Sequence, residues 1–253
     1  MDREPPLVSG GIGPNGPSGY EGGKFMWKEE VDASAAVGIE DWGIDAGWWA
    51  ERFEDTDFSQ GLGCFEANTN QYPQGLRAVS DYVHAKGMKF GLWFEIERVD
   101  IRTANRGRRP WKPEWLVHQN GFPHRSWCQH AFCLCLGVPE AQDWAIDNLS
   151  WAIREYNLDL VFIDSNEWAV CDDPHHGHGA ADGEWAQIQG LYRVLASLRK
   201  EFPTLLITNL GGGSQRSDFG MARFTHRMCP ADVVCPTAVN RKYSHGIGFI
   251  LPV

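Results

Sequence analysis

Carboxylates that follow buried strands are the residues of this sequence with the clearest potential for chemistry. The segment Leu158–Trp168 begins as a continuous apolar run, delivers Asp164 to the end of that run and then becomes polar. Such runs are typical of strands buried on both faces of a parallel sheet, and parallel barrels keep their chemistry at the carboxyl ends of their strands. The alternative is that Asp164 caps the N-terminus of a helix, because Asp is a good N-cap residue.

Other predicted strands end in side chains of the same kind. They lead to Glu95 and Glu97, to Asn209 with the glycines up to Gly213, and to Asp232. Glu95 and Glu97 could bind a sugar, and a structural salt bridge is an equal alternative. Asp232 could also be a solvated loop acid. The positions alone leave these alternatives open.

One loop invites a metal hypothesis. Residues 172–178 read Asp-Asp-Pro-His-His-Gly-His, and both His and Asp are metal ligands. Consecutive residues in a Gly-rich loop are more typical of a solvated lid, so we predict no native metal site. The seven Cys are scattered along the chain, and we assign them no chemistry.

The elements that must position these side chains alternate between strand and helix. We predict strands at residues 6–9, 39–45, 88–94, 158–163, 205–208, 227–229 and 247–253, with helices at 28–37, 76–83, 139–156, 188–198, 218–224 and 238–244. This alternation is typical of a parallel α/β protein. Because polar residues follow several strands, we predict a closed (β/α)8 TIM-type barrel rather than an open sheet with one switch point. The long irregular segment Arg98–Gly137 indicates a functional loop or lid.

Seven strands are one too few for such a barrel. The last, Ile247–Val253, has no following helix to cover it and would leave an exposed sheet edge. We therefore expect the chain to be a fragment of a longer protein or a truncated gene product, with a barrel incomplete at its C-terminal end. Residues 1–24 form a weakly determined Gly- and Pro-rich segment with a candidate first strand, and residues 25–253 form the barrel.

Composition and charge exclude several function classes. The net charge of −10 argues against nucleic acid and anionic membranes as partners. The sequence shows no basic segment followed by an apolar leader and no run that approaches a membrane span. It also lacks a Gly-x-Gly-x-x-Gly turn and a P-loop, so no nucleotide cofactor is predicted. We expect a soluble, cytoplasmic protein without a cofactor, and a homo-oligomer is left open. Twelve Trp suit a carbohydrate partner, although most Trp in proteins is core.

Several segments resemble, in the same order, the catalytic barrel of the retaining α-galactosidases of glycoside hydrolase family 36. The most specific match joins Tyr72–Leu76 with Lys86–Glu97 and resembles the family pattern FPxGL…KGMKFGLWFEPE. The other matches are Gly38–Glu40 with Ile44–Trp48 to GIExFVIDAGW, Leu134–Ala141 to LDLGNPEA, Ile163–Asn166 to W-D-x-N, and Asn209–Asp218 with Ala231-Asp232 to NCASGGRRxD…RSD.

The resemblance implies a role for individual residues. Asp164 matches the nucleophile and Asp232 the acid/base of a double-displacement hydrolysis of terminal α-glycosidic bonds, in which the two carboxyls lie about 5 Å apart. No metal is needed, and an oligosaccharide or other glycoside is the expected partner. Members of the family usually carry β-sandwich domains on both sides of the barrel, and none is visible here. The predicted substrate-binding residues are Asp45, Trp48, Trp93, Glu95, Asn166, Asn209 and Gly213.

Departures from the family pattern bear on the substrate. Phe162 stands where the family places a sugar-binding lysine two residues before the nucleophile. Other departures are Ala46, Ile96, Cys135, Leu210 and Gln129. Gln129 stands where the family has an arginine, and Arg125 is a candidate to replace that arginine. Both catalytic carboxylates remain, so we expect altered specificity rather than lost catalysis, with α-galactosides favoured. The alternatives are a related α-glycosidase of different sugar specificity, a non-catalytic carbohydrate-binding barrel, and a metal-dependent hydrolase that uses His175–His178.

Overall fold

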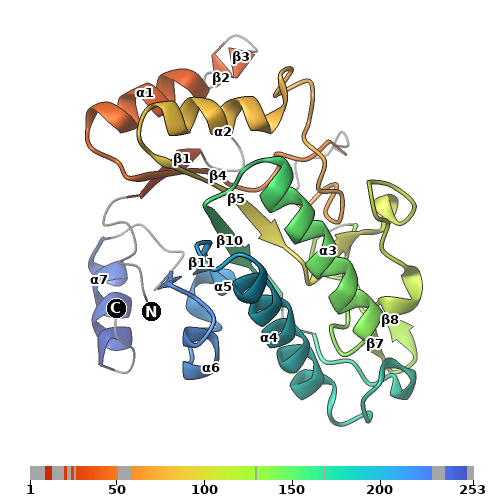
Figure 1. The fold of residues 1–253 in the computed structure, drawn as a ribbon. Coiled ribbons are helices and arrows are strands. Elements are labelled where there is room, and N and C mark those ends of the chain that lie inside the picture. Colours follow the sequence, from red (N-terminus) through yellow and green to blue (C-terminus); the bar gives the residue numbers. More distant parts are fainter. Residues whose placement is uncertain are drawn as a thin grey trace.

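A six-stranded parallel sheet forms the centre of the protein (Figure 1). The computed structural model describes residues 9–12, 20–21, 24–25, 27–50, 59–128, 130–167, 169–229 and 237–249. Neighbouring strands of the sheet follow one another in chain order, so the described sheet has no reversal of strand order. The strands, in that order, are β1 (Ser9–Ile12), β4 (Asp41–Ile44), β5 (Lys89–Glu95), β10 (Leu160–Asp164), β11 (Leu206–Asn209) and β12 (Arg227–Met228).

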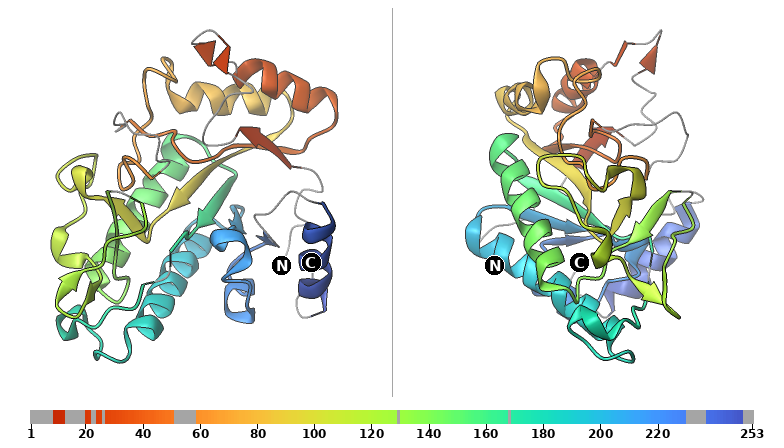
Figure 2. Two further views of the ribbon diagram at one scale, coloured as in Figure 1. Left: turned by 180° about the vertical axis from the view of Figure 1, so that it is seen from behind. Right: turned by 90° about the vertical axis from the view of Figure 1, so that its right-hand side faces the viewer.

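Helices connect the strands and cover the sheet. In Figures 1 and 2, α2, α3 and α4 follow one another along the same side of the sheet. Each buries the apolar face that helical spacing predicts; in α2 this face consists of Leu76, Val79 and Val83. The helices are α1 (Trp27–Ala36), α2 (Gly75–Ala85), α3 (Pro139–Glu155), α4 (Gly183–Glu201), α5 (Gly211–Ser214), α6 (Phe219–Ala222) and α7 (Thr237–Gly248).

The long segment between β5 and α3 contains short antiparallel pairs. Strand β6 (Arg98–Asp100) pairs with β9 (Ala131–Cys133), and β7 (His118–Gln119) pairs with β8 (Phe122–Pro123). Strands of two or three residues are too short to show a periodic pattern, which explains why the segment reads as irregular in the sequence. The remaining short elements are β2 (Tyr20–Glu21), β3 (Lys24–Phe25), η1 (Ile101–Thr103), η2 (Pro113–Trp115) and η3 (Pro174–His176).

Most predicted strands are confirmed to within two residues, with exceptions at the two ends of the chain. The first strand begins at Ser9 instead of ending there, and residues 1–8 lie outside the described residues. The strand predicted over Ile247–Val253 is wrong where the structure describes it, because Ile247 and Gly248 close helix α7. A short apolar run is compatible with either element when periodicity is the sole guide. Residues 250–253 lie outside the described part of the chain.

An ion pair between a buried carboxylate and a half-buried guanidinium shows that the sheet is strongly curved. Arg227 on β12 donates a hydrogen bond from Nη1 to Oδ2 of Asp41 on β4, at 3.0 Å. Three strands separate these two in the sheet, and in a flat sheet they would lie roughly 19 Å apart, beyond the reach of the two side chains. The sheet therefore bends so that both side chains meet on its concave face. Whether further pairing closes it into a barrel stays a prediction.

A helix that crosses a membrane must be both long and apolar. Within the described ranges, no helix has both the length and the apolar character needed to cross a membrane.

We predict that the Asp41–Arg227 pair stabilises the curved sheet. Asp41 is fully buried, so Asp41→Asn removes the negative charge that faces the guanidinium of Arg227 and should lower the free energy of unfolding by about 2–3 kcal/mol, as measured by urea denaturation. The matched control is Asp81→Asn, which breaks an exposed pair with Arg77 on α2 and should cost less than about 0.5 kcal/mol. Equal losses in the two variants would contradict the argument.

Candidate active site

Four hydrogen-bond donors surround the carboxylate of Asp164 at the end of β10. Oδ1 accepts from the backbone N–H groups of Ser165 and Gly212, both at 2.8 Å. Oδ2 accepts from Nε1 of Trp93 at 3.1 Å and from Nδ2 of Asn166 at 3.0 Å. These donors come from the ends of three strands and fix the orientation of the carboxylate. No helix begins at Ser165, so the N-cap alternative for Asp164 is wrong.

Trp93 is itself held in place by its aromatic neighbours. The backbone carbonyl of Trp93 accepts a hydrogen bond from Nε1 of Trp48 at 2.8 Å, and its ring lies against Trp49 with centroids 5.7 Å apart. Trp48 is fully buried and also packs against Phe65 and Tyr156. The structure therefore places Trp48 behind Trp93, and Trp93 beside Asp164.

Glu95 forms a buried ion pair with Arg98 next to Asp164. The guanidinium donates from Nε to Oε1 at 2.8 Å and from Nη2 to Oε2 at 2.7 Å, and both side chains are inaccessible to solvent. The backbone N–H of Asn166 also donates to Oε1 of Glu95, at 2.7 Å. Glu95 is the register partner of Asp164 in the parallel pair β5–β10. Glu95 thus anchors the residue that follows the β10 strand end.

The pKa of Arg98 reflects this environment. Burial lowers the pKa of the guanidinium, but the charge of Glu95 and the hydrogen bonds to it outweigh burial and raise the pKa above its ordinary value. Arg98 therefore remains charged. The buried carboxylate of Glu95 needs such a charged partner, because an unpaired buried charge is strongly destabilising.

A second buried ion pair joins the ends of β5 and β11. Glu97 accepts hydrogen bonds from both Nη atoms of Arg216 and from Nε2 of Gln187, the latter at 2.8 Å. Burial lowers the pKa of Arg216, but the charge of Glu97 and the hydrogen bonds to it outweigh burial. The pKa of Arg216 therefore lies above its ordinary value. The carbonyl of Arg216 accepts from Nδ2 of Asn209 at 3.0 Å. Asn209 and Arg216 thereby shape the turn that follows β11.

The Gly212 amide is a contact that sequence reasoning missed. Residues 211–213 have φ values of 48°, 57° and 76°, in the left-handed region that favours glycine. A Cβ atom on Gly212 would lie 2.7 Å from the carbonyl oxygen of Ser165. Glycine therefore lets this backbone approach β10 closely enough to donate to Asp164. The Gly-Gly-Gly run in the sequence signals such an approach, although it does not say which N–H makes the contact.

The predicted site residues gather at one edge of the sheet, as far as the structure describes them. Trp93, Glu95, Asp164 and Asn166 form one hydrogen-bonded group. Asp45 follows β4 at the same edge, where its Oδ1 accepts from the N–H of Ala46. Two others lie in or next to the β11 turn, namely Asn209 and Gly213. Asp232 and Gln129 lie outside the described residues. Arg125 is exposed.

Phe162 packs inside the curve of the sheet, two residues before Asp164. A Cβ atom on Gly43 of β4 would lie 2.3 Å from the Phe162 ring, so the absent side chain at Gly43 makes room for the ring. In the pairing of β10 with β5, Phe162 lies opposite Trp93. An apolar ring thus borders the group around Asp164.

Comparison with known proteins identifies relatives along nearly the whole chain. The family model described as Melibiase matches residues 23–252. An α-galactosidase of Escherichia coli is 31% identical over 206 residues, which are 80% of this chain and 27% of that protein. The crystal structure of an α-galactosidase from Lactobacillus brevis is 26% identical, with a TM-score of 0.79 over 97% of this chain and 32% of that chain.

A further structure shares the fold over the full chain. The α-galactosidase AgaA of Geobacillus stearothermophilus, in complex with stachyose, has a TM-score of 0.81 and 24% identity over 100% of this chain and 34% of that one. The chain thus spans about a third or less of the length of these relatives.

We predict that Glu95 is held in the site by the charge of Arg98. In Glu95→Leu the buried guanidinium loses the carboxylate of Glu95, which should lower the free energy of unfolding by about 3–5 kcal/mol in urea denaturation. The double variant Glu95→Leu/Arg98→Met removes both charges and should recover much of that loss. A double variant as unstable as the sum of its two single variants would argue against a charge-based role.

Proposed function

The chain belongs to the melibiase family, the α-galactosidases of glycoside hydrolase family 36, and on that premise we propose that it hydrolyses terminal α-galactosidic bonds with retention of configuration. In this proposal Asp164 is the nucleophile and Asp232 is the acid/base. The observation that carries it is the set of four donors that orients Asp164 at the carboxyl edge of the sheet. A nucleophile held in one orientation meets the anomeric carbon without first reorganising its surroundings.

The order of the strands supports Asp232 as the partner carboxyl. Asp232 follows β12 in the sequence, and a single strand, β11, separates β12 from β10. The carboxyl ends of β10 and β12 are therefore about 10 Å apart along the sheet. The carboxyl groups of a retaining pair lie roughly 5 Å apart. If the side chains of Asp164 and Asp232 extend toward each other from these two strand ends, their carboxyl groups can reach that separation.

The reaction then proceeds in two displacements. Asp164 attacks the anomeric carbon while the glycosidic C–O bond breaks, and Asp232 gives its proton to the departing oxygen. The product of this step is a galactosyl ester of Asp164. Asp232, now a carboxylate, takes a proton from water, and the resulting hydroxide attacks the anomeric carbon and releases Asp164. The two inversions together retain the configuration.

The predicted sugar subsite follows from the same edge of the sheet. We assign Asp45, Trp93, Asn166 and the β11 turn with Asn209 and Gly213 to substrate binding. Glu95 and Trp48 act through their neighbours, because Glu95 is fully paired with Arg98 and Trp48 is buried behind Trp93.

Phe162 sets the specificity in this proposal. Its ring presents carbon where the family pattern has a cationic donor, so a sugar hydroxyl at this point gains no charged hydrogen bond. We therefore propose α-galactosides as the substrate class, with a subsite that discriminates less sharply among sugar hydroxyls. Stachyose, which is bound in the Geobacillus stearothermophilus relative, is a suitable natural probe.

In this proposal the fold is a (β/α)8 barrel, and the six described strands of the parallel sheet are part of its wall. The curvature required by the Asp41–Arg227 pair supports closure. Residues 25–253 would supply the other strands of the barrel, and strand β1, which lies within residues 1–24, pairs with β4 as the first of them.

We predict that Asp164→Gly abolishes turnover of aryl α-galactosides and that azide restores it. The variant lacks the nucleophile, so kcat should fall by roughly 10³-fold or more, while azide can occupy the vacated space and attack the anomeric carbon to give a β-galactosyl azide. Activity and the anomer of the product are measured by NMR on the full-length protein.

The control for this substitution is Asp143→Ala, an exposed aspartate on α3 that should leave kcat unchanged. Binding of sugar with turnover unaffected by Asp164→Gly would favour a non-catalytic carbohydrate-binding barrel. Inverted product from the unmodified protein would rule out the double displacement.

We predict that Trp93→Phe lowers kcat by about 10–100-fold, with a smaller effect on KM. The variant keeps an aromatic ring but removes the Nε1 donor to Asp164, and a hydrogen bond to a charged group contributes about 1.5–3 kcal/mol. The matched control is Trp144→Phe, which removes an indole donor to the carbonyl of Arg109, away from the site. If both variants reduced kcat equally, the loss would reflect packing rather than orientation of Asp164.

A further inference from the structure

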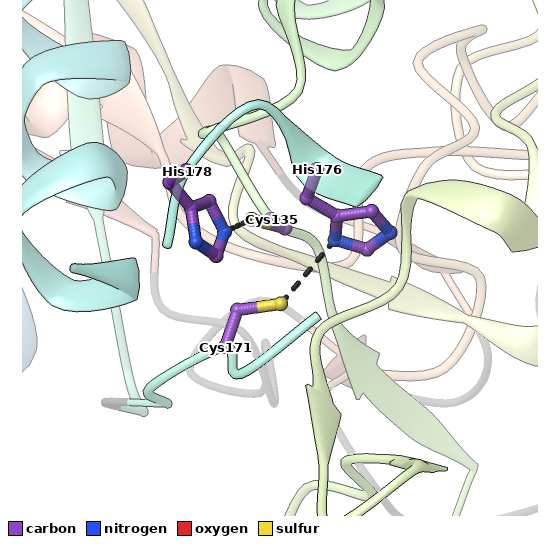
Figure 3. A group of neighbouring side chains, drawn as sticks. All are labelled: Cys135, Cys171, His176 and His178. Atoms are coloured by element: carbon purple, nitrogen blue, oxygen red, sulfur yellow. Dashed lines mark hydrogen bonds between the residues drawn. The ribbon is translucent and has the colours of Figure 1, made fainter. Parts of the chain in front are cut away.

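Two Cys and two His from the segments that follow β9 and β10 converge on one another (Figure 3). Cys135 lies in the turn between β9 and α3, and the other three come from the loop between β10 and α4. Cys135 Sγ is 3.3 Å from Nε2 of His178, and Cys171 Sγ is 3.3 Å from Nδ1 of His176. All four ligand atoms lie within 4.8 Å of one another.

This spacing matches a tetrahedral ion. With Zn–S bonds of about 2.3 Å and Zn–N bonds of about 2.0–2.1 Å, the edges of the tetrahedron measure about 3.3–3.8 Å. Cys135, Cys171 and His176 are buried and His178 is half-buried. The two S···N distances of 3.3 Å match the edges of such a tetrahedron, and the other pairs of ligand atoms lie within 4.8 Å.

A backbone N–H group faces the sulfur atom of Cys171. The N–H of His118 points at Cys171 Sγ with an N···S distance of 3.5 Å. Such a donor stabilises negative charge on a metal-bound thiolate and orients it, which is the usual task of groups around a metal ligand.

The imidazole rings are oriented in the same manner. Nδ1 of His178 lies 2.9 Å from the carbonyl oxygen of Gly179, so it carries the proton and leaves Nε2 with a lone pair directed at Cys135. Nε2 of His176 faces the carboxylate of Asp173 at 3.6 Å, while its Nδ1 faces Cys171. Gly177 between them has a φ of 81°, and this left-handed turn lets both rings face the sulfurs.

We propose that Cys135, Cys171, His176 and His178 bind a zinc ion. Two thiolates and two imidazoles form the donor set that zinc takes in structural sites, and no carboxylate or carbonyl ligand of the kind preferred by calcium or magnesium is among the four. With four protein ligands no coordination position is left for water. The ion is therefore structural and takes no part in hydrolysis.

The sequence supports this assignment independently of the catalytic proposal. Cys135 stands at one of the departures from the family pattern, where an aspartate is usual, and the same chain carries the Cys171…His176-x-His178 spacing. One ion would join the β10–α4 loop to the turn before α3, two segments that are far apart in the chain. That loop begins directly after Asp164, so zinc would limit its motion at the edge where the site lies.

The test is metal analysis of the full-length protein, purified with a tag free of histidine and without added metal. We expect one zinc ion per chain by plasma mass spectrometry. Replacement by Co²⁺ should give the strong visible d–d bands of a tetrahedral site together with a thiolate charge-transfer band in the near ultraviolet. Removal of the ion with a chelator should lower the melting temperature by several degrees, and zinc should restore it.

Single variants assign the ligands. Cys171→Ser and His178→Ala should each lose most of the zinc and shift or abolish the cobalt spectrum. The matched controls are His175→Ala, an exposed histidine of the same loop, and Cys64→Ala, a buried thiol elsewhere, and both should keep one zinc ion per chain.

Three outcomes would overturn the proposal. They are a chain without stoichiometric metal, a disulfide between Cys135 and Cys171 in protein purified under reducing conditions, and a His175→Ala variant that loses zinc as readily as His178→Ala. Loss of zinc on substitution of His118 or Asp173, with retention in Cys171→Ser, would place the ion on the neighbouring His118–Asp173–His176 group instead. None of these readouts depends on α-galactosidase activity, so the two proposals fail separately.

Discussion

The site depends on how two neighbouring carboxylates are accommodated at the edge of a parallel sheet. The register of β5 and β10 places Glu95 directly beside Asp164. Two anions at that separation repel each other, and burial strengthens the repulsion because the interior screens charge weakly. Arg98 offsets the charge of Glu95 from three residues along the chain, with two hydrogen bonds and no exposure to solvent. Asp164 can then be held by donors of its own.

The surrounding structure supports this arrangement from several directions. The indole of Trp93 reaches Asp164 because Trp48 fixes the Trp93 backbone from behind. The β11 turn reaches it because three glycines adopt left-handed conformations, and Arg216 connects that turn to Glu97 on the β5 side. The Asp41–Arg227 pair joins β4 to β12 across the concave face of the curved sheet. Local hydrogen bonds, buried charges and sheet curvature therefore act on the same few side chains.

The sequence predicts the main strands and the position of Asp164 because apolar runs and the polar residues after them are local signals. It does not predict the Arg98–Glu95 pair, since Arg98 opens a segment whose strands are too short to show a period. Nor does it identify the Gly212 donor, because a backbone N–H has no residue type. The Cys135 cluster is missed for another reason: its fourth member comes from a distant turn, and fold topology alone brings it to the histidine loop. At the C-terminal end, Ile247 belongs to a helix that a short apolar run does not distinguish from a strand.

The central claim is that Asp164 forms a covalent bond to the sugar, and trapping that bond tests it most directly. A fluorinated α-galactoside that forms the galactosyl ester faster than it hydrolyses would be incubated with the full-length protein, which is then digested and analysed by tandem mass spectrometry. The account predicts one added fluorosugar, located on Asp164. A label on another carboxylate, or inactivation without any covalent sugar, would contradict it.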